Sequence, residues 1–439
     1  MWPYYEELLR RPVPRYTSYP TAAEFKPEIG PAQYRKALSR IAPGTSISLY
    51  IHIPFCEQIC WYCGCNTAKA NKPARLAAYL EALHEEIRMV AALLPSGCSI
   101  SRIAFGGGSP NAISPVDFAR IIDHLTIDFA ALDPLISVEL DPRQFGLGWL
   151  RAVAAVGVNY VSLGVQTFDP AVQAAIGRVQ PYEAIEELVE ELRLIGVRSI
   201  NFDLMYGLPG QDESILADTI DKAIGLRPDR IALFGYAHLP SILPRQRQID
   251  DSNLPGMADR FRMASLGHDR LTAAGYQPIG FDHFALPADP LAAAAAEGRL
   301  HRNFQGFTDD ACNVVIGLGA SAISHLPGLY TQNAKNSGQY REALCRGELA
   351  VERGIATTAE DARRARAIEN ILCSRATEMP RSLTSEQRQF IANLEKKGLV
   401  RQAGRKLGLS DEGLPYARVI ASIFDGYRPV TSGTFSAAV

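Results

Sequence analysis

Residues 46–66 read SISLYIHIPFCEQICWYCGCN, and this stretch decides the fold. Residues 46–54 are apolar and rich in β-branched side chains, which is typical of a buried strand. Four cysteines follow at positions 56, 60, 63 and 65, with the spacing C-x3-C-x2-C-x-C. We therefore predict a buried strand that carries a loop of thiols to one end of a sheet.

The spacing of these thiols favours an iron–sulfur cluster over other uses of cysteine. Structural zinc sites typically combine two separated knuckles, and no second knuckle follows here. A disulfide framework is uncommon in a cytosolic chain of this size. A four-iron cluster on Cys56, Cys60 and Cys63 leaves one iron open to a substrate or cofactor. The scattered cysteines are expected to be small buried hydrophobic residues: Cys98, Cys312, Cys345 and Cys373.

Further apolar segments repeat the pattern of the first one. They are residues 102–105, 136–140, 160–165, 199–205 and 230–236. Amphipathic stretches typical of helices lie between them, at residues 74–93, 182–194, 212–224 and 257–274. Strands that alternate with helices indicate a parallel sheet covered by helices. The predicted fold class is therefore α/β, a partial (β/α)6 TIM-like barrel whose last edge is extended near residues 277–281.

The alternation of strands and helices stops near Ala285, which predicts a change of domain. We expect an N-terminal arm at residues 1–45, the barrel at residues 46–289, and a mostly helical C-terminal domain at residues 290–439. Within the last region, residues 291–297 are typical of a helix, and residues 398–409 of a wing-like hairpin.

Composition and charge exclude other classes of function. The chain of 439 residues has 45 basic and 47 acidic residues, and its net charge of −2 does not suit a nucleic-acid surface. The basic run at residues 396–406 is therefore interpreted as a solvated face and not as a DNA-reading winged helix. No apolar stretch is long enough to cross a membrane, and the first residues lack a signal-peptide core. We expect a cytoplasmic monomer without nucleic-acid or membrane partners.

Chemically notable residues end the predicted strands, where the active sites of parallel barrels gather. The glycines at 106–108 can bring exposed backbone N–H groups close to a ligand, because no Cβ obstructs the approach. Acidic side chains at strand ends suit ribose hydroxyls, and the planar fork of Arg178 suits a ligand carboxylate. Residues 281–285 and 301–308 combine aromatic with polar side chains and could line a pocket for a flat anionic molecule.

The spacing C-x3-C-x2-C directly after a strand resembles the radical S-adenosylmethionine (SAM) superfamily. Longer motifs resemble the oxygen-independent coproporphyrinogen III oxidase (dehydrogenase) family of heme biosynthesis: PRYTSYPTA, LYIHIPFCEQICWYCGCN, FGGGSPN, VELDPR, SLGVQTF, FDLMYGLPGQ, FGYAHLP, GFDHFA, HRNFQGFT and LGASAIS. Heme-chaperone relatives share only the barrel motifs, and an aromatic residue usually replaces Cys65 in them. The resemblance favours the enzyme, with a heme-binding, chaperone-like protein on the same radical SAM barrel as the alternative.

The resemblance implies a 4Fe–4S cluster on Cys56, Cys60 and Cys63 and two SAM molecules, one of which binds the open iron. Positions that match contacts to the cluster-bound SAM are Tyr50, Gly107, Glu139 and Ile323. Positions that match contacts to the second SAM are Tyr62, Gly108, Ser109, Gln166, Arg178, Asp203 and Ala237.

The implied reaction is the oxidative decarboxylation of two propionate side chains of coproporphyrinogen III to vinyl groups, giving protoporphyrinogen IX. A SAM-derived 5′-deoxyadenosyl radical removes hydrogen from the propionate β-carbon. The resemblance also implies an electron donor such as flavodoxin or ferredoxin and an electron acceptor of unknown identity. Arg15 and Arg302 are candidates to meet the substrate carboxylates, and Cys65 is expected to touch the substrate or to order the loop.

Overall fold

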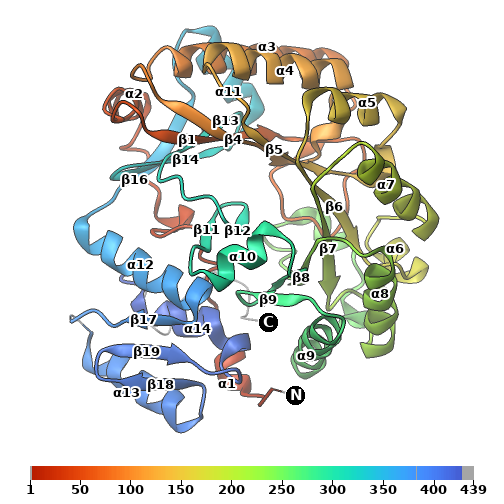
Figure 1. Cartoon of the computed structure of the whole chain (residues 1–439), viewed down its shortest axis with the longest axis vertical. Coiled ribbons are helices and arrows are strands. Elements are labelled where there is room, and N and C mark those ends of the chain that lie inside the picture. The colour runs from red at the N-terminus through yellow and green to blue at the C-terminus, as the bar shows by residue number, and fades with distance from the viewer. Residues whose placement is uncertain (1, 382, 428–439) are drawn as a thin grey trace.

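The structure, a computed structural model that describes residues 2–381 and 383–427, is built around one large sheet (Figure 1). Within these residues, twelve strands pair in the order β16-β15-β14-β13-β1-β4-β5-β6-β7-β8-β10-β9. The strands predicted from the sequence form its parallel centre. They are β1 (Ser46–Ile53), β4 (Ser99–Gly107), β5 (Leu135–Leu140), β6 (Tyr160–Gln166), β7 (Ser199–Tyr206) and β8 (Arg230–Gly235). The partial barrel is therefore confirmed.

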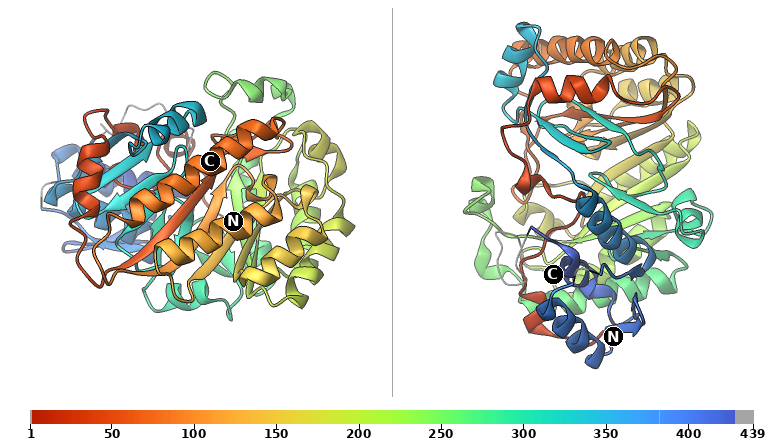
Figure 2. Two further views of the ribbon diagram at one scale, coloured as in Figure 1. Left: turned by 90° about the horizontal axis from the view of Figure 1, so that it is seen from above. Right: turned by 90° about the vertical axis from the view of Figure 1, so that its left-hand side faces the viewer.

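Helices cover the outer face of this barrel, as Figures 1 and 2 show. They are α3 (Pro73–Ala91), α4 (Pro115–Asp128), α5 (Leu147–Val156), α6 (Pro170–Ala175), α7 (Tyr182–Leu194), α8 (Glu213–Leu226) and α9 (Met257–Ala273). In α3, Leu80, Leu83, Ile87 and Val90 recur at helical spacing and are buried against the sheet. Each such side chain contributes roughly 1.5–3 kcal/mol of burial free energy. No helix in the described part of the chain is long and apolar enough to span a membrane.

Four strands from the later part of the chain extend the sheet beyond β1. β13 (Val315–Leu318) pairs parallel with β1, and the antiparallel strands β14 (Ile323–Leu326), β15 (Leu329–Asn333) and β16 (Val351–Ala356) follow. At the opposite edge, β10 (His283–Ala285) and β9 (Gln277–Ile279) extend β8 where the sequence predicts an extension. The region after residue 290 thus contributes strands to the sheet as well as helices.

The remaining C-terminal elements form a separate layer below the barrel in Figure 1. They are α12 (Ala359–Ser374), β17 (Ala376–Glu378), α13 (Ser385–Lys396), β18 (Val400–Ala403), β19 (Lys406–Leu409) and α14 (Ala417–Ala421). β18 and β19 form the expected hairpin. The division of the chain at residues 45 and 289 stays a prediction, and residues 428–439 of the expected C-terminal domain lie outside the described residues.

The N-terminal arm packs on this C-terminal layer before it reaches the barrel. The arm contains α1 (Glu6–Leu9) and α2 (Pro31–Leu38). Its buried side chains Leu8, Leu9, Val13, Tyr16 and Tyr19 share a hydrophobic core with α12, α13 and α14. The Tyr16 hydroxyl donates to an Asp425 carboxylate oxygen at 3.0 Å, and the Tyr416 hydroxyl donates to the carbonyl of Pro3 at 2.6 Å. The arm and the C-terminal layer therefore form one packed unit.

A short hairpin faces the interior of the barrel. It consists of β11 (His301–Asn303) and β12 (Gly306–Thr308). Asn303, Gln305 and Phe307 line an internal cavity of about 360 Å³ together with Glu139 and Asp203 of the barrel strands. The motif HRNFQGFT thus lies across the barrel from the strand ends that carry the acidic residues.

Candidate active site

A cavity of about 700 Å³ lies at the carboxyl ends of the barrel strands. Because parallel strands end at the same edge, residues far apart in the sequence meet there. The site residues predicted from the sequence that line this cavity are Arg15, Cys56, Cys60, Tyr62, Cys63, Cys65, Gly107, Gly108, Ser109, Glu139, Gln166, Arg178, Asp203 and Ala237.

Three predicted residues line other cavities. Tyr50 and Ile323 face a neighbouring cavity of about 170 Å³ together with Phe304 and Gln305. Arg302 lines a cavity of about 450 Å³ between the arm, β11 and α12. The structure therefore does not place these three on the wall of the main cavity.

Tyr50 hydrogen-bonds to His52, and the His52 ring packs against Gly107 of the main cavity. The Tyr50 hydroxyl lies 3.1 Å from His52 Nδ1, and Ser321 Oγ lies 3.2 Å from His52 Nε2. A Cβ atom on Gly107 would lie 2.5 Å from the His52 ring, so glycine is required there for the strand end to pass the imidazole. His52 thus separates the two cavities and fixes the position of the residues on both sides.

The thiol of Cys60 accepts hydrogen bonds from two arginines. Arg143 Nη2 and Arg178 Nη1 each donate to its Sγ at 3.3 Å. Asp141 holds both guanidinium groups, at 2.6 Å from Arg143 Nη2 and 3.2 Å from Arg178 Nη2. Burial opposes ionisation of Asp141, but the two arginines outweigh it and lower the pKa of this carboxyl. Two cationic donors therefore converge on one sulfur atom of the loop.

The donor set of this loop fits an iron–sulfur cluster better than a single metal ion. Within the described residues, no three His, Cys, Asp or Glu side chains are gathered closely enough to hold one ion. The side chains of Cys56, Cys60 and Cys63 all line one cavity, as ligands to different corners of a cluster would. The Cys65 backbone N–H donates to Cys63 Sγ at 3.3 Å, which orders the loop.

The glycines at the end of β4 also allow two segments of backbone to pack closely. The N–H of Gly108 donates to Ile53 O at 2.8 Å and that of Ser109 to Phe55 O at 2.7 Å, so these donors are used within the protein. A Cβ atom on Gly108 would lie 2.4 Å from Phe55 O. Glycine therefore allows the end of β4 to lie directly against the start of the cysteine loop.

Two carboxyl groups face the cavity from β5 and β7. Enclosure by the barrel wall raises the pKa of Glu139 to about 7, and the neighbouring Asp203 adds to the rise. Burial also raises the pKa of Asp203, although Asn201 and Ser162 donate to its oxygens at 2.9 and 3.2 Å. The two groups can accept hydrogen bonds from ligand hydroxyls without requiring a counter-ion.

Gln166 has an acceptor that the protein leaves unused. Its side chain is 6% exposed, and among the described residues its Oε1 atom has no hydrogen-bond partner. Its φ of +62° is a left-handed conformation that is uncommon for residues other than glycine. A buried unpaired acceptor and backbone strain in a cavity wall both indicate a ligand contact.

Arg178 does not present a free fork to a ligand. Its Nε donates to Gly164 O at 3.0 Å, and its Nη groups contact Gly164, Asp141 and Cys60. The side chain is 7% exposed. The expected pairing with a ligand carboxylate therefore competes with contacts that support the cysteine loop.

Sequence reasoning missed two residues that hold the site together. Arg143 lies within the motif VELDPR, so a signal was present, but only its neighbours were singled out. Gln246, in the short helix Pro244–Gln248, donates to the carbonyls of Tyr62 at 2.9 Å and Ala237 at 3.1 Å. No local pattern marks Gln246, because its role depends on loops that only tertiary structure brings together.

The expectation that the scattered cysteines are buried is wrong. Cys345 is exposed, and Cys98, Cys312 and Cys373 are partly exposed. Each lies at the end of a helix or in a loop, where a small polarizable side chain tolerates partial contact with water.

Comparison with known proteins agrees with this site. The Radical SAM superfamily model matches residues 50–223. Anaerobic coproporphyrinogen III oxidase 1 of Cereibacter sphaeroides is 41% identical over 427 residues, which cover 95% of this chain and 94% of that protein. Oxygen-independent coproporphyrinogen III oxidase of Escherichia coli is 38% identical over 425 residues, which cover 94% and 93%.

A solved structure extends the likeness to three dimensions. The structure of coproporphyrinogen III oxidase from Escherichia coli, a radical SAM enzyme, matches with a TM-score of 0.91 and 36% identity, and the match covers 97% of this chain and 100% of that one. The resemblance predicted from the sequence motifs is thereby confirmed. The chain belongs to the oxygen-independent coproporphyrinogen III oxidase family within the radical SAM superfamily.

Proposed function

We propose that this protein catalyses the oxygen-independent oxidative decarboxylation of coproporphyrinogen III to protoporphyrinogen IX in heme biosynthesis. Two propionate side chains become vinyl groups, and each loses CO2, one hydrogen atom and one electron. One observation carries the proposal: the cysteine loop and the ends of the barrel strands line the same cavity. The relatives that share this chain over nearly its full length are named for this reaction.

The superfamily uses a 4Fe–4S cluster and SAM, and we infer that Cys56, Cys60 and Cys63 hold the cluster. When bound, cluster and SAM supply the 5′-deoxyadenosyl radical that removes a hydrogen atom from the substrate. The chain's own contribution to this centre is electrostatic, because Arg143 and Arg178 donate to Cys60 Sγ. Cys65 orders the loop through its backbone N–H and does not need to be an iron ligand.

We further infer two SAM sites at this end of the barrel, one in the main cavity and one reaching the neighbouring cavity lined by Tyr50 and Ile323. One would be contacted by Tyr50, Gly107, Glu139 and Ile323. The other would be contacted by Tyr62, Gly108, Ser109, Gln166, Arg178, Asp203 and Ala237. All members of the second set line the main cavity, whose volume of about 700 Å³ is ample for a cofactor. The unpaired Gln166 Oε1 supports a ligand at that position.

The residues of the cavity have positioning roles in this proposal. Radical abstraction needs no general base, so a nucleophile activated by histidine is not required. Glu139 and Asp203 would accept hydrogen bonds from ribose hydroxyls, and Arg15 would bring a positive charge from the arm to the substrate side of the cavity. Arg302 faces a different cavity, so its predicted contact with the substrate would need a second opening.

The electron donor, the electron acceptor and the oligomeric state are also proposals. The reduced cluster needs a one-electron donor, for which a flavodoxin or ferredoxin is suitable, and the substrate radical needs an acceptor for its remaining electron. We also propose that the chain acts as a monomer. A heme-carrying role on the same barrel is not favoured, because the full-length relatives are named as oxidases.

The decisive experiment is an anaerobic assay of the reconstituted protein with SAM, a reductant and coproporphyrinogen III. We expect protoporphyrinogen IX and 5′-deoxyadenosine, separated by chromatography. Cleavage of SAM without any vinyl product would overturn the assignment of the substrate. Tight heme binding without turnover would point to the carrier instead.

A further inference from the structure

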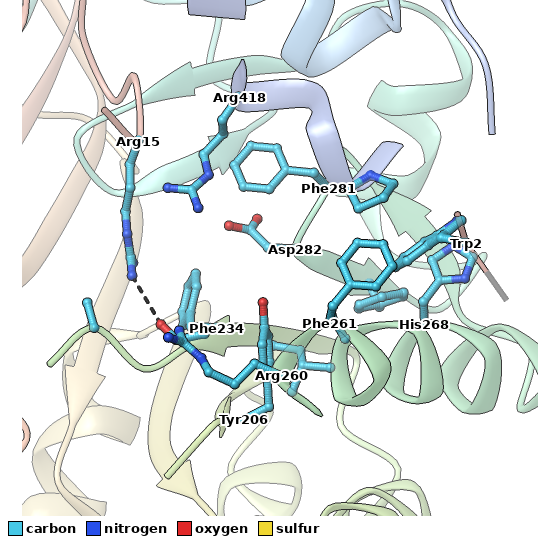
Figure 3. A pocket seen from close by; sticks show the side chains of 16 residues that line it. Trp2, Arg15, Tyr206, Phe234, Arg260, Phe261, His268, Phe281, Asp282 and Arg418 are labelled. Carbon is cyan, nitrogen blue, oxygen red and sulfur yellow. Dashed lines mark hydrogen bonds between the residues drawn. The ribbon is translucent and has the colours of Figure 1, made fainter. Parts of the chain in front are cut away.

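A small cavity of about 70 Å³ lies beside the main one and shares part of its wall. Arg15, Phe234, Gly235 and Ala237 line both cavities. Figure 3 shows that the guanidinium groups of Arg15, Arg260 and Arg418 surround the small cavity together with Asp282 and Tyr206. The arm, α9 and α14 each supply one of these arginines, so parts of the chain that are far apart in sequence converge here.

The charges around this cavity do not balance. Asp282 is the one carboxylate in its wall within the described residues, and Asp282 Oδ1 already lies 2.6 Å from His283 Nδ1. Arg15 makes a long hydrogen bond of 3.5 Å to Gly235 O. Arg260 Nη2 donates to Tyr236 O at 2.5 Å, but its buried Nε atom has no partner among the described residues.

Like charges held this close together are costly unless an anion joins them. Burial, with the nearby charge of Arg15 next in importance, lowers the pKa of Arg418 to about 10. Burial likewise lowers the pKa of Arg260. The charge of Arg260, whose buried Nε atom has no partner among the described residues, is therefore disfavoured, and an anionic ligand would remove this penalty.

The size and shape of the cavity select the anion. A volume of about 70 Å³ has room for a few heavy atoms, which is enough for a carboxylate on a short chain and too little for SAM or a tetrapyrrole. Guanidinium groups match the planar fork of a carboxylate. The rings of Tyr206, Phe234 and Phe281 give the cavity an apolar side that suits methylene groups (Figure 3).

We propose that Arg15, Arg260 and Arg418 form a carboxylate pocket that holds one propionate of the tetrapyrrole substrate while the ring occupies the adjoining main cavity. This inference rests on the proposed function, because it names the residues that bind a carboxylate of that substrate. A propionate held here is an anchor and not the group that reacts. It also connects the arm to α14, so that substrate binding fastens the arm over the cavity.

The test measures binding of coproporphyrin III, the stable oxidised form of the substrate, to the full-length reconstituted protein by porphyrin absorbance. The variants are Arg15→Gln, Arg260→Gln and Arg418→Gln. A hydrogen bond to a charged group is worth about 1.5–3 kcal/mol, so each variant should bind at least about tenfold more weakly. The tetramethyl ester of coproporphyrin III, which has no carboxylates, should bind the variants and the wild type equally.

Arg262→Gln is the matched control. Arg262 lies on the same helix as Arg260, but it faces the surface, where it pairs with Glu213 at 2.7 Å. Arg262→Gln should bind coproporphyrin III like the wild type. Iron content and melting temperature verify folding, and Arg15→Gln keeps the test valid if Arg260→Gln fails to fold, because Arg15 is exposed.

The outcomes separate this inference from the proposed function. Equal affinity of wild type and variants for coproporphyrin III, in a wild type that converts the substrate, would overturn the pocket alone. An equal loss of affinity for the ester would also overturn it, because the damage would then not concern the carboxylate. A wild type that neither binds the porphyrin nor converts the substrate would overturn the proposed function.

Discussion

Arg143 Nη2 donates a hydrogen bond to Cys60 Sγ at 3.3 Å, from a side chain that Asp141 holds in place. Hydrogen bonds to the sulfur ligands of iron–sulfur clusters raise the reduction potential, because they stabilise the added negative charge. Arg143→Gln should therefore lower the reduction potential of the reconstituted cluster without loss of iron. Potentiometric titration followed by electron paramagnetic resonance measures this shift. Arg151→Gln, at an exposed position on α5, should leave the potential unchanged, and an unchanged potential in Arg143→Gln would refute the role given to this contact.

The cysteine loop gives a second prediction, which separates ligands from supporting residues. Replacement of Cys56, Cys60 or Cys63 by alanine should reduce the iron bound after anaerobic reconstitution from about four atoms per chain to a small fraction and should remove the brown absorbance. Cys65→Ala should retain the iron, because its contribution to the loop is a backbone N–H. Cys98→Ala is the control outside the loop. The measurement is the iron content per chain after reconstitution. A wild-type iron content in the alanine variants of Cys56, Cys60 and Cys63 would contradict the assignment of these residues as ligands.

Gly108 gives a prediction about stability. A Cβ atom there would lie 2.4 Å from Phe55 O, and a backbone carbonyl cannot move away as a flexible side chain can. Gly108→Ala should therefore reduce the free energy of unfolding by about 1–3 kcal/mol. Gly225→Ala, inside α8 with no atom nearer than 3.9 Å to the new methyl group, should instead raise it by up to about 1 kcal/mol. Urea denaturation compares the two, and equal stabilities would show that the contact of β4 with the loop is not tight.

The buried carboxyl group of Glu86 should make the free energy of unfolding depend on pH. It is 1% exposed and accepts hydrogen bonds from Gly319 N and Asn333 Nδ2 at 2.6 Å and from Tyr340 Oη at 2.7 Å. Burial outweighs these bonds and raises the pKa of this carboxyl to about 7 from an ordinary value of 4.5. The folded protein thus holds the proton more tightly than the unfolded chain does. Stability should fall as the pH rises from 4.5 to about 7, by up to about 3 kcal/mol.

Glu86→Gln tests this pH dependence, because it removes the titrating group. Denaturant unfolding at a series of pH values should show a flatter profile for Glu86→Gln than for the wild type between pH 4.5 and 7. Glu81→Gln, at an exposed position on the same helix α3, should keep the wild-type profile. Glu139, whose pKa is also raised to about 7, keeps a residual slope in both proteins; a slope in Glu86→Gln equal to that of the wild type would show that Glu86 does not contribute.

The barrel could be predicted from the sequence because its strands carry their own signal. Residues 231–234 (IALF), for example, are apolar on both faces, which is typical of a strand in a parallel sheet that is covered on both sides. β13 to β16 were not predicted, because short antiparallel strands such as β14 (Ile323–Leu326) owe their pairing to neighbours that are distant in the chain. β13 (Val315–Leu318), by contrast, is an apolar run of the same kind as the barrel strands, and the prediction missed it.

Prediction of the site succeeded to the extent that strand ends determine it. Glu139, Gln166 and Asp203 lie in one cavity because parallel strands end together. Tyr50 and Ile323 were grouped with them by resemblance, yet His52 stands between the two cavities, and only the packing of its ring reveals this. The sequence around Arg260 and Arg418 does not indicate a binding role. The two residues meet only because α9, α14 and the arm come together in the folded chain.

The hydrogen bonds from Tyr416 to Pro3 and from Tyr16 to Asp425 join the first and last parts of the chain, and this determines when the arm can fold during synthesis. Residues at the start of the chain leave the ribosome first, but the surface on which they pack is translated last. The segment that carries Val13 and Arg15 to the cavity wall can therefore reach its place only after α14 has been translated. Packing of the arm on the C-terminal layer is therefore a late step in the folding of this chain.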